Sequence, residues 1–443
     1  MGAGGPGMSA LARLLHEMGH RVTACDLRVS EVTSRLERDG ISVMLGNDDS
    51  HVGGIDIVTY SSAMTVEHHE LRAAQALGVA TYSRAEALRI ACSARPTIGV
   101  AGTHGKTTTT AMLSAILIAC GKDPSYLIGG DTVLPGSNAH WGAGEVLVVE
   151  ADESDSTHLQ LPLRGAIVTN VDLDHLDNFG SFEEILRSFE QFVDSVDGPV
   201  MIGYDDPRSR QLMRERDVMS FGVEGGDYRA VDVELRPGRA FFNLEHGSAR
   251  CRVEIEQRGL HNVRNALGAI SMAHRWGVDL DEACAAIRNF QGVARRFDVR
   301  GSARGAMFVD DYAHLPAEIA STLAAARAEA GDRRIIAVFQ PNRFNRMDKM
   351  SADYRDAFVE ADVTVITEIY ASGTLPIEGV SGSLVVDAIR SAHPSSDVRW
   401  CPTRSRLIDE VVDVVGEGDI CISMGCGDIE HLPGEVMKRI GIS

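Results

Sequence analysis

The sequence predicts an α/β protein of three domains, and three observations support this prediction. The chain has 443 residues, more than a single hydrophobic core usually organises. Short apolar runs rich in β-branched residues alternate with helical segments, as in parallel α/β folds. Several of these runs end in glycine or polar residues, and ligands bind at that edge of an open parallel sheet. We therefore expect an N-terminal Rossmann-like nucleotide domain (1–94), a central P-loop ATPase domain (95–298) and a C-terminal Rossmann-like α/β domain (299–443).

The N-terminal block opens with a glycine-rich segment. Gly2, Gly4 and Gly7 spell G-x-G-x-x-G before a predicted helix, and Asp26 ends the next strand, as in dinucleotide-binding folds. Strands are predicted over 20–26, 56–61 and 79–83, and helices over 31–40, 67–78 and 84–94. The motif requires a strand before its first glycine, where only Met1 stands. We expect either that this domain lacks its first strand or that the true start of the chain lies upstream.

The central block begins with a phosphate-binding loop that lacks its usual first glycine. Residues 97–113 read TIGVAGTHGKTTTTAML, and Val100 stands where G-x-x-x-x-G-K-[ST] has glycine. Gly102 and Gly105 supply the backbone freedom that a close approach to phosphate needs. With a buried strand before it and a helix after it, this loop is predicted to place Lys106 on the β- and γ-phosphates. Thr107 would then offer its hydroxyl to Mg²⁺.

Two acidic segments follow predicted strands of the same domain. The polar residues at the ends of EVLVVEADESD and GAIVTNVDLDHLD are Glu150, Asp152, Glu153 and Asp155, then Asn170, Asp172, Asp174, His175 and Asp177. Parallel strands present their carboxyl ends at one edge of a sheet, so both segments are expected beside the glycine loop. Hard oxygen ligands with at most one imidazole suit Mg²⁺ or Mn²⁺ better than zinc.

The rest of the chain continues the α/β pattern. Residues 228–257 alternate polar and apolar side chains around two turns, which predicts a small antiparallel sheet, and helices follow over 261–277 and 279–290. In the last block, strands are predicted over 306–312, 333–340, 362–370 and 419–428.

The composition excludes several classes of function. A net charge of −20 argues against sequence-independent binding to nucleic acid or anionic membranes. The longest apolar stretch, 111–120, is too short to span a membrane, and no export signal is visible. The eight cysteines are scattered without a CxxC pair, so we expect free thiols in a reducing, cytoplasmic compartment.

Six segments of this chain occur in the order seen in the Mur ligases. They are GTHGKTTTT, EADESD, TNVDLDHLD, GLHNVRNAL, GVARRF and DDYAHLP. The chain therefore resembles this family of ATP-dependent enzymes of peptidoglycan precursor synthesis over essentially its whole length. The N-terminal strings GAGGPGMS and YSSAM look most like the branch that adds L-alanine to UDP-N-acetylmuramate.

The resemblance implies a set of ligand-binding residues. The UDP-sugar would contact Gly4, Gly5, Gly7, Met8, Ser9, Asp26, Ser62, Glu153 and Ser154. MgATP would contact Gly102, Thr103, His104, Gly105, Lys106, Thr107, Thr108, Asn262, Asn265, Arg296 and Asp311, with Thr107, Glu150 and His175 as metal ligands. The amino acid would contact Tyr312, His314, Arg343 and Arg346.

The resemblance also implies the reaction. The γ-phosphoryl group of ATP would move to the lactyl carboxylate of UDP-N-acetylmuramate, and the amine of L-alanine would attack the acyl phosphate. The tetrahedral intermediate would expel phosphate and leave an amide, with release of ADP. Lys106, His175, Arg296 and Asp311 are the implied catalytic residues, and His175 and Asp311 are candidates for accepting the proton of the amine.

The C-terminal motifs depart from the family strings DDYGHHP, FQPHRYTR and YAAGE. The departing residues are Leu315, Asn342, Phe344, Asn345 and Thr374. L-Alanine remains the favoured acceptor, while glycine, L-serine or a murein tripeptide are alternatives. A non-catalytic nucleotide-binding relative is the alternative from another class, and a folate polyglutamylating enzyme would not explain the N-terminal glycine motif. The protein is expected to act as a monomer or homodimer, without nucleic-acid or membrane partners.

Overall fold

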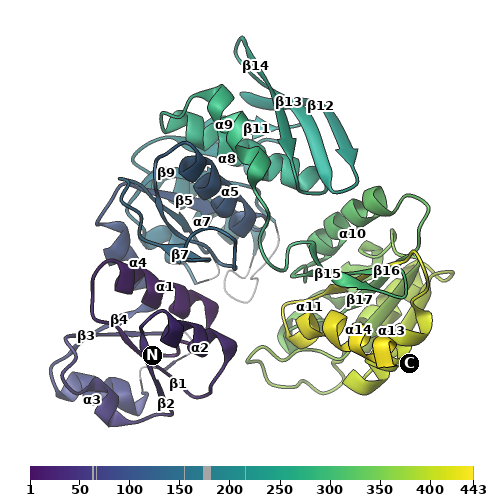
Figure 1. Ribbon diagram of the computed structural model, residues 1–443, viewed down its shortest axis with the longest axis horizontal. Coiled ribbons are helices and arrows are strands. Elements are labelled where there is room, and N and C mark those ends of the chain that lie inside the picture. The colour runs from purple at the N-terminus through teal and green to yellow at the C-terminus, as the bar shows by residue number, and fades with distance from the viewer. Residues whose placement is uncertain (62–63, 66, 154, 173–180, 215, 443) are drawn as a thin grey trace. The chain divides into compact units, whose positions relative to one another are not determined.

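The computed structural model describes residues 1–61, 64–65, 67–153, 155–172, 181–214 and 216–442. The chain forms two compact units. The first comprises Met1–Asp232, Phe242–Ile255 and Arg264–Gln291, and the second comprises Val233–Phe241, Glu256–Val263 and Gly292–Ser443. Both units are built on mainly parallel sheets covered by helices, which confirms the predicted α/β class (Figure 1).

Two pairs of parallel strands form the N-terminal part of the first unit. β1 (Thr23–Asp26) pairs with β2 (Ser42–Leu45), and β3 (Ile57–Tyr60) pairs with β4 (Ala80–Ser83). The helices here are α1 (Pro6–Glu17), α2 (Glu31–Arg38), α3 (His69–Ala76) and α4 (Arg84–Cys92), with the short 3-10 helix η1 (Asp49–Val52). The sequence predicted these elements except β2 and η1, whose four-residue spans carry little periodicity.

Residues 1–3 lie between the two strand pairs. The backbone N–H groups of Gly2 and Ala3 donate to the Cys25 carbonyl oxygen at 2.9 and 3.1 Å. The amino group of Met1 donates to the Thr59 carbonyl oxygen at 2.7 Å. This segment therefore occupies the position that the glycine motif assigns to its first strand.

The central segment of the chain forms a ten-stranded sheet, in the order β14-β13-β12-β11-β10-β9-β5-β8-β6-β7 (Figure 1). Its strands are β5 (Thr97–Ala101), β6 (Ser125–Leu127), β7 (Ala139–His140), β8 (Leu147–Glu150), β9 (Leu163–Val168), β10 (Val200–Gly203), β11 (Met219–Gly222), β12 (Tyr228–Arg236), β13 (Arg239–His246) and β14 (Ala249–Ile255). β5 pairs in parallel with β8 on one side and β9 on the other. The predicted hairpin strands β12 to β14 form, but β12 pairs with β11, so they extend the central sheet instead of standing apart.

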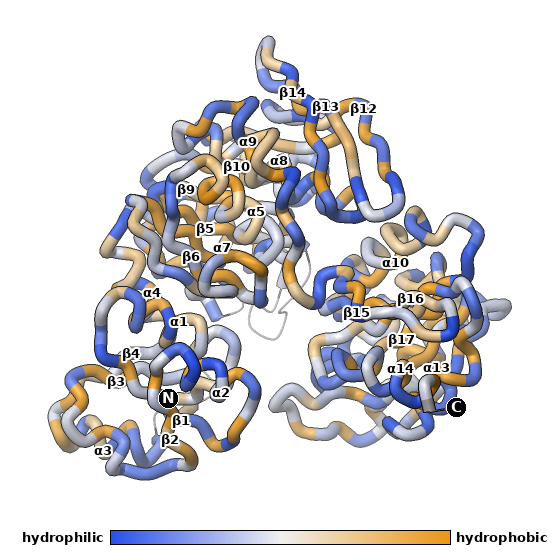
Figure 2. The backbone as a smooth tube through the Cα atoms, in the orientation of Figure 1, coloured by the Kyte–Doolittle hydropathy of each residue, from blue (hydrophilic) through white to orange (hydrophobic). Residues whose placement is uncertain are grey.

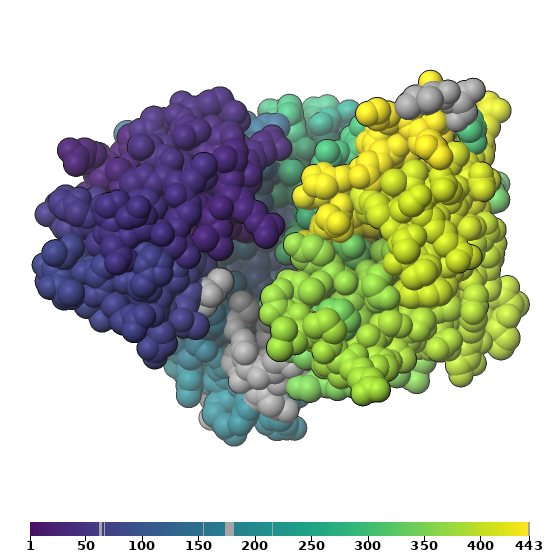
Figure 3. All heavy atoms as spheres, turned by 90° about the horizontal axis from the view of Figure 1, so that it is seen from below, coloured from purple at the N-terminus to yellow at the C-terminus, as the bar shows by residue number. Residues whose placement is uncertain are grey.

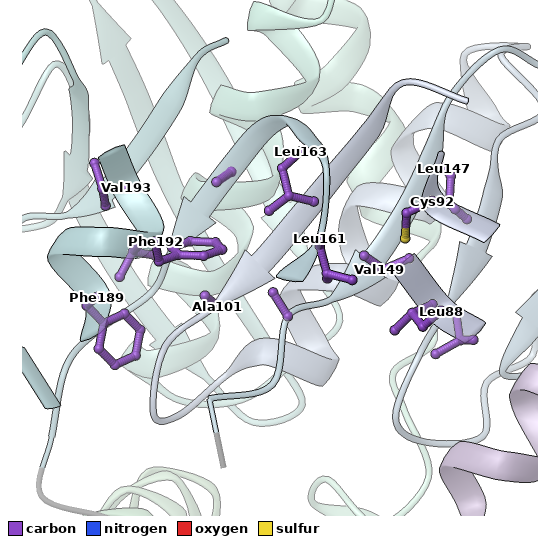
Figure 4. Packing of buried hydrophobic residues seen from close by; sticks show 14 of the residues in the cluster. Leu88, Cys92, Ala101, Leu147, Val149, Leu161, Leu163, Phe189, Phe192 and Val193 are labelled. Carbon is purple, nitrogen blue, oxygen red and sulfur yellow. The ribbon is translucent and has the colours of Figure 1, made fainter. Parts of the chain in front are cut away.

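Helices cover the central sheet because its inner strands β5, β8, β9 and β10 are buried on both faces. The helices are α5 (Lys106–Ala119), α7 (Phe182–Ser195), α8 (Leu260–Arg275) and α9 (Leu280–Ala286), with the 3-10 helices η2 (Thr157–Gln160), η3 (Ser209–Met213) and η4 (Ile287–Asn289). The hydrophobic segments concentrate along β5 and β9 (Figure 2). Phe189 and Phe192 of α7 pack with Leu163 and Val149 on one face (Figure 4), and Leu88 of α4 joins the same core. The N-terminal and central segments thus share one core, which explains why they form one unit.

The second unit contains a six-stranded sheet in the order β15-β16-β20-β17-β18-β19. The strands are β15 (Asp298–Ala303), β16 (Ala306–Asp311), β17 (Ile335–Phe339), β18 (Val363–Thr367), β19 (Asp397–Cys401) and β20 (Ile420–Met424), and β15 alone runs antiparallel to its neighbour. Its helices are α10 (Pro316–Ala330), α11 (Phe344–Met350), α12 (Ser383–Ala392), α13 (Arg404–Val414) and α14 (Leu432–Ile442), with η5 (Ser351–Asp356) and η6 (Asp428–His431). Separate apolar cores fill the two faces of this sheet, and Figure 3 shows its C-terminal residues as a continuous body, green to yellow. None of the helices in the described part of the chain combines the length and apolarity needed to cross a membrane.

Candidate active site

The loop between β5 and α5 explains how the chain dispenses with the usual first glycine. Val100 is fully buried in β5 and pairs with Glu150 of β8, so it belongs to the core of the sheet. Gly102 has φ +124°, and a Cβ atom there would lie 2.1 Å from Oγ1 of Thr169. Gly105 has φ +82° and caps α5. The two glycines of a tighter turn therefore provide the close backbone approach.

The end of β9 holds this loop in place. Asn170 accepts a hydrogen bond from the His104 N–H at its Oδ1 (2.9 Å) and donates one to the His104 carbonyl oxygen (2.9 Å). The N–H of Asp172 donates to the Thr103 hydroxyl at 2.7 Å, and the Thr169 hydroxyl donates to the His104 carbonyl oxygen at 2.6 Å. The residues that follow β9, including Thr169, thus fix the backbone of the loop. The sequence did not predict this role.

Lys106 is the first residue of α5, and its ammonium group folds back over the loop. Its Nζ donates to the carbonyl oxygens of Gly102 (2.7 Å) and Thr103 (3.3 Å) and to Oε1 of Glu153 (2.8 Å). Burial favours loss of the Lys106 proton, but the charges of Glu153 and Asp152 outweigh it and raise the pKa. Lys106 therefore remains protonated at neutral pH.

Glu153 was predicted to contact the UDP-sugar, and the structure places it against Lys106 instead of leaving it exposed. Its side chain is only 3% exposed, and burial raises the pKa of the carboxyl group. One carboxylate oxygen, Oε2, has no hydrogen-bond partner within the described residues. The charge of the half-buried Lys106 is thus balanced by a buried carboxylate that has one oxygen free to accept a hydrogen bond.

Two of the three predicted metal ligands lie together. The Thr107 hydroxyl donates to Oε2 of Glu150 at 3.3 Å, and the Gly129 N–H donates to the other carboxylate oxygen. Burial raises the pKa of Glu150. The third, His175, falls in 173–180, outside the described residues, as do Asp174 and Asp177. Gly129 was missed because only the pairing of β6 with β8 brings it to this carboxylate.

The predicted asparagine pair lies on α8, and both side chains are buried. Asn265 borders the glycine loop, since a Cβ atom at Gly105 would lie 2.4 Å from its Oδ1. Asn262 donates from Nδ2 to the Arg258 carbonyl oxygen at 2.8 Å. Thr108, also predicted to contact ATP, is the third residue of α5, and its side chain is buried.

The N-terminal glycine motif begins α1, with Gly5 as the residue before the helix. The Gly4 N–H donates to Oδ2 of Asp26 at 2.7 Å, so the acid expected near a nucleoside contacts the glycine loop. The side chains of Met8 and Ser9 are buried. A Cβ atom at Gly7 would lie 3.2 Å from Nη1 of Arg84, whose other terminal nitrogen donates to Asp155. Ser62 and Ser154 lie outside the described residues.

In the second unit, Asp311 ends β16 and is buried. Its two carboxylate oxygens accept hydrogen bonds from the N–H groups of Ala313 (2.8 Å) and Phe297 (2.7 Å). Burial raises the pKa of Asp311 to about 6, although the charge of Arg296 opposes this rise. The Arg296 guanidinium lies 5.2 Å from the centre of the Tyr312 ring, so three of the predicted residues form one group.

Two residues that depart from the family strings form hydrogen bonds within the segment that contains the predicted amino-acid-binding residues. Asn342 accepts a hydrogen bond from Nη1 of Arg346 at 2.8 Å, and Thr374 accepts one from the Phe344 N–H at 3.0 Å. Arg343, with φ +63°, is the residue before α11. The backbone N–H of His314 donates to Oε2 of Glu318 at 3.0 Å, and its Nδ1 lies 3.2 Å from the same oxygen. Leu315, the residue before α10, is buried.

The raised pKa of Asp311 gives a prediction for stability. Its pKa is about 6 in the folded protein against 3.8 for the exposed group, so the folded state holds the extra proton between these values. The free energy of unfolding should therefore fall as the pH rises from about 4 to about 6. Asp311→Asn should remove roughly 2–3 kcal/mol of this pH dependence in urea unfolding. The exposed Asp332→Asn is the control, and equal pH dependence of wild type and Asp311→Asn would contradict the assignment.

The sequence matches three family descriptions in succession. These are the Mur ligase family catalytic domain over residues 1–95, the Mur ligase middle domain over 100–273 and the Mur ligase glutamate ligase domain over 295–427. UDP-N-acetylmuramate–L-alanine ligases from Rubrobacter xylanophilus and Geobacter sp. are 40% and 38% identical. Each alignment covers 99% of this chain, and 99% and 96% of the respective relatives.

Solved structures give the same result. The UDP-N-acetylmuramate–alanine ligase of Thermotoga maritima superimposes with a TM-score of 0.83 at 28% identity, covering 100% of this chain and 98% of the other. A murein peptide ligase from Psychrobacter arcticus gives 0.74 at 26% identity, covering 99% and 98%. With such relatives over its full length, and with the glycine loop, Lys106 and Glu150 at one edge of its central sheet, the chain belongs to the Mur ligase family.

Proposed function

We propose that this protein joins L-alanine to the lactyl carboxylate of UDP-N-acetylmuramate through an acyl phosphate formed from ATP, with release of ADP and phosphate, in peptidoglycan precursor synthesis. The observation that carries this proposal is the grouping of Lys106, Thr107 and Glu150 at the carboxyl ends of β5 and β8. It occurs in a chain that is 40% identical over 99% of its length to a relative named for this ligation.

The residues around the loop fit a hydrated magnesium ion. The Thr107 hydroxyl and the Glu150 carboxylate are hard oxygen donors 3.3 Å apart, and we propose His175 as a further ligand. Mg²⁺ bound here would neutralise charge on the transferred phosphoryl group. Mn²⁺ has similar ligand preferences and is expected to substitute.

The remaining roles follow from charge and position. Lys106 would bind the β- and γ-phosphates, exchanging part of its contact with Glu153 for phosphate oxygens. We further propose that 1–94 binds the UDP-sugar, 95–298 binds ATP and 299–443 binds the amino acid. In the last segment, a carboxyl group with a pKa of about 6 is mostly ionised at neutral pH, so Asp311 could accept the proton of the attacking amine.

The proposal is tested by measuring ADP release while each co-substrate is omitted in turn. Release should require UDP-N-acetylmuramate and an amino acid together, and L-alanine should exceed glycine, L-serine and a murein tripeptide in kcat/KM. Faster reaction with the tripeptide would identify a recycling ligase. No ADP release with any acceptor would identify a non-catalytic relative.

Glu150→Gln should raise the Mg²⁺ concentration needed for half-maximal ADP release by at least about 10-fold. The substitution keeps the size of the side chain but removes the charge that would face the cation. Glu145→Gln, at an exposed position before the same strand, is the matched control. An unchanged magnesium requirement in Glu150→Gln would remove this residue from the metal site.

A further inference from the structure

A second group of ligating side chains lies in the N-terminal part, among residues that take no part in the proposed ligation. It contains Cys25 of β1, His51 of η1 and Glu70 of α3. One ligand atom from each residue lies within 4.8 Å of the other two. β1 belongs to the strand pair β1–β2, whereas η1 and α3 precede and follow β3 in the chain (β1 and α3 are labelled in Figure 1).

Glu70 is a buried carboxylate whose partners are histidines. Its side chain is 1% exposed. Oε1 lies 2.8 Å from Nδ1 of His51 and accepts a hydrogen bond from the Asp48 N–H at 3.1 Å. Oε2 lies 3.6 Å from Nδ1 of His68 and has no hydrogen-bond partner within the described part of the chain. A buried carboxylate with an unused oxygen is costly unless a cation compensates it.

We propose that Cys25, His51 and Glu70 bind a zinc ion. A thiolate, imidazole nitrogens and a carboxylate are the ligands that zinc takes in tetrahedral sites, and the thiolate disfavours Mg²⁺. On binding, the Cys25 thiol releases its proton to solvent and the zinc–sulfur bond forms. The Asp48 N–H remains on the carboxylate and orients it, as partners outside the ligand shell do in metal sites.

The position of the site gives the ion a structural role. The two strand pairs have separate small cores, one of Ala3, Ala24, Leu36 and Ile41, the other of Val52, Val58, Leu71 and Ala74. Cys25 comes from the first pair, whereas Glu70 lies on the helix that packs on the second. Cores of this size stabilise little by themselves, so a zinc ion that joins them would cross-link the N-terminal part.

Charge balance by a histidine is the alternative to metal coordination, because Nδ1 of His51 lies 2.8 Å from Oε1 of Glu70. The test below separates the two possibilities, since charge balance alone produces no metal–sulfur bond.

The experiment uses the full-length protein stripped of metal and titrated with Co²⁺, whose thiolate complexes absorb in the near ultraviolet. We expect one equivalent to give a sulfur-to-cobalt band that Zn²⁺ abolishes, and Zn²⁺ to raise the melting temperature. The X-ray absorption spectrum of the zinc form should contain one sulfur at about 2.3 Å and nitrogen or oxygen at about 2.0–2.1 Å. These measurements need no variant, so they decide the question even where a substitution prevents folding.

Variants then assign the ligands. Cys25→Ser and Glu70→Gln should each lower the affinity for Co²⁺ at least 10-fold, and Cys25→Ser should remove the band. His69→Gln and Cys92→Ser are matched controls, because His69 pairs with Asp49 and Cys92 is the buried last residue of α4. No band in wild type, a spectrum without sulfur, or a band that survives Cys25→Ser would overturn the proposal.

Discussion

Replacing Lys106 with alanine is expected to lower ADP release by at least about 10²–10³-fold. The half-buried ammonium group is held over the loop by the carbonyl oxygens of Gly102 and Thr103, where the phosphates would lie. The measurement is the rate of ADP release with ATP, UDP-N-acetylmuramate and L-alanine all saturating.

The same substitution leaves Glu153 buried without its ion-pair partner, and breaking such a pair typically costs about 3–5 kcal/mol. Lys106→Ala combined with Glu153→Gln should therefore recover thermal stability without recovering ADP release. Lys122→Ala, at an exposed position just beyond α5, is the control for removing a lysine. Recovery of the rate together with stability would show that Lys106 acts only by supporting the fold.

Replacing Gly102 with alanine should both destabilise the first unit and abolish nucleotide binding. The residue has φ +124°, and the new Cβ atom would lie 2.1 Å from Oγ1 of Thr169 and 2.9 Å from the Asn170 carbonyl oxygen. Backbone strain costs about 1–3 kcal/mol, and displacement of these neighbours adds about 1–3 kcal/mol. Thermal unfolding and calorimetric titration with MgATP measure the two effects.

Gly121→Ala separates strain from displacement. Gly121 has φ +70° at the far end of the same helix, and nothing lies within 4 Å of its would-be Cβ atom. This variant should lose only about 1–2 kcal/mol and bind nucleotide normally. Equal behaviour of the two variants would mean that the contact between the loop and the end of β9 does not shape the site.

Much of the loop could be predicted from the sequence because its signals are local. The apolar run 97–101, the glycines at 102 and 105 and the start of α5 at Lys106 are close neighbours in the chain, and each predicted element forms. The acidic segments were also expected at the same sheet edge. Their different roles were not predicted. Asn170 and Asp172 hold the loop, whereas Glu150 accepts a hydrogen bond from Thr107.

The residues of the C-terminal segment that depart from the family strings could not be interpreted from local sequence patterns. In the sequence, Leu315, Asn342 and Thr374 stand inside motifs expected near the acceptor, so a changed acceptor stayed open as an alternative to L-alanine. In the structure, Asn342 and Thr374 hydrogen-bond to the α11 segment and Leu315 is buried. These contacts depend on the segment around Tyr370 lying beside residue 342, which no local pattern reveals.

Local patterns were enough to predict the fold class, most of the strands and helices, and the residues of the phosphate loop, because these depend on periodicity and spacing over short stretches. The partners of the charged groups became known from the packing of the chain. Each group joins residues from distant segments of the chain. These groups are Lys106 with Glu153, Glu150 with Gly129, and Cys25 with His51 and Glu70. Strand order and helix packing bring these groups together, and burial then makes each charge depend on its neighbours.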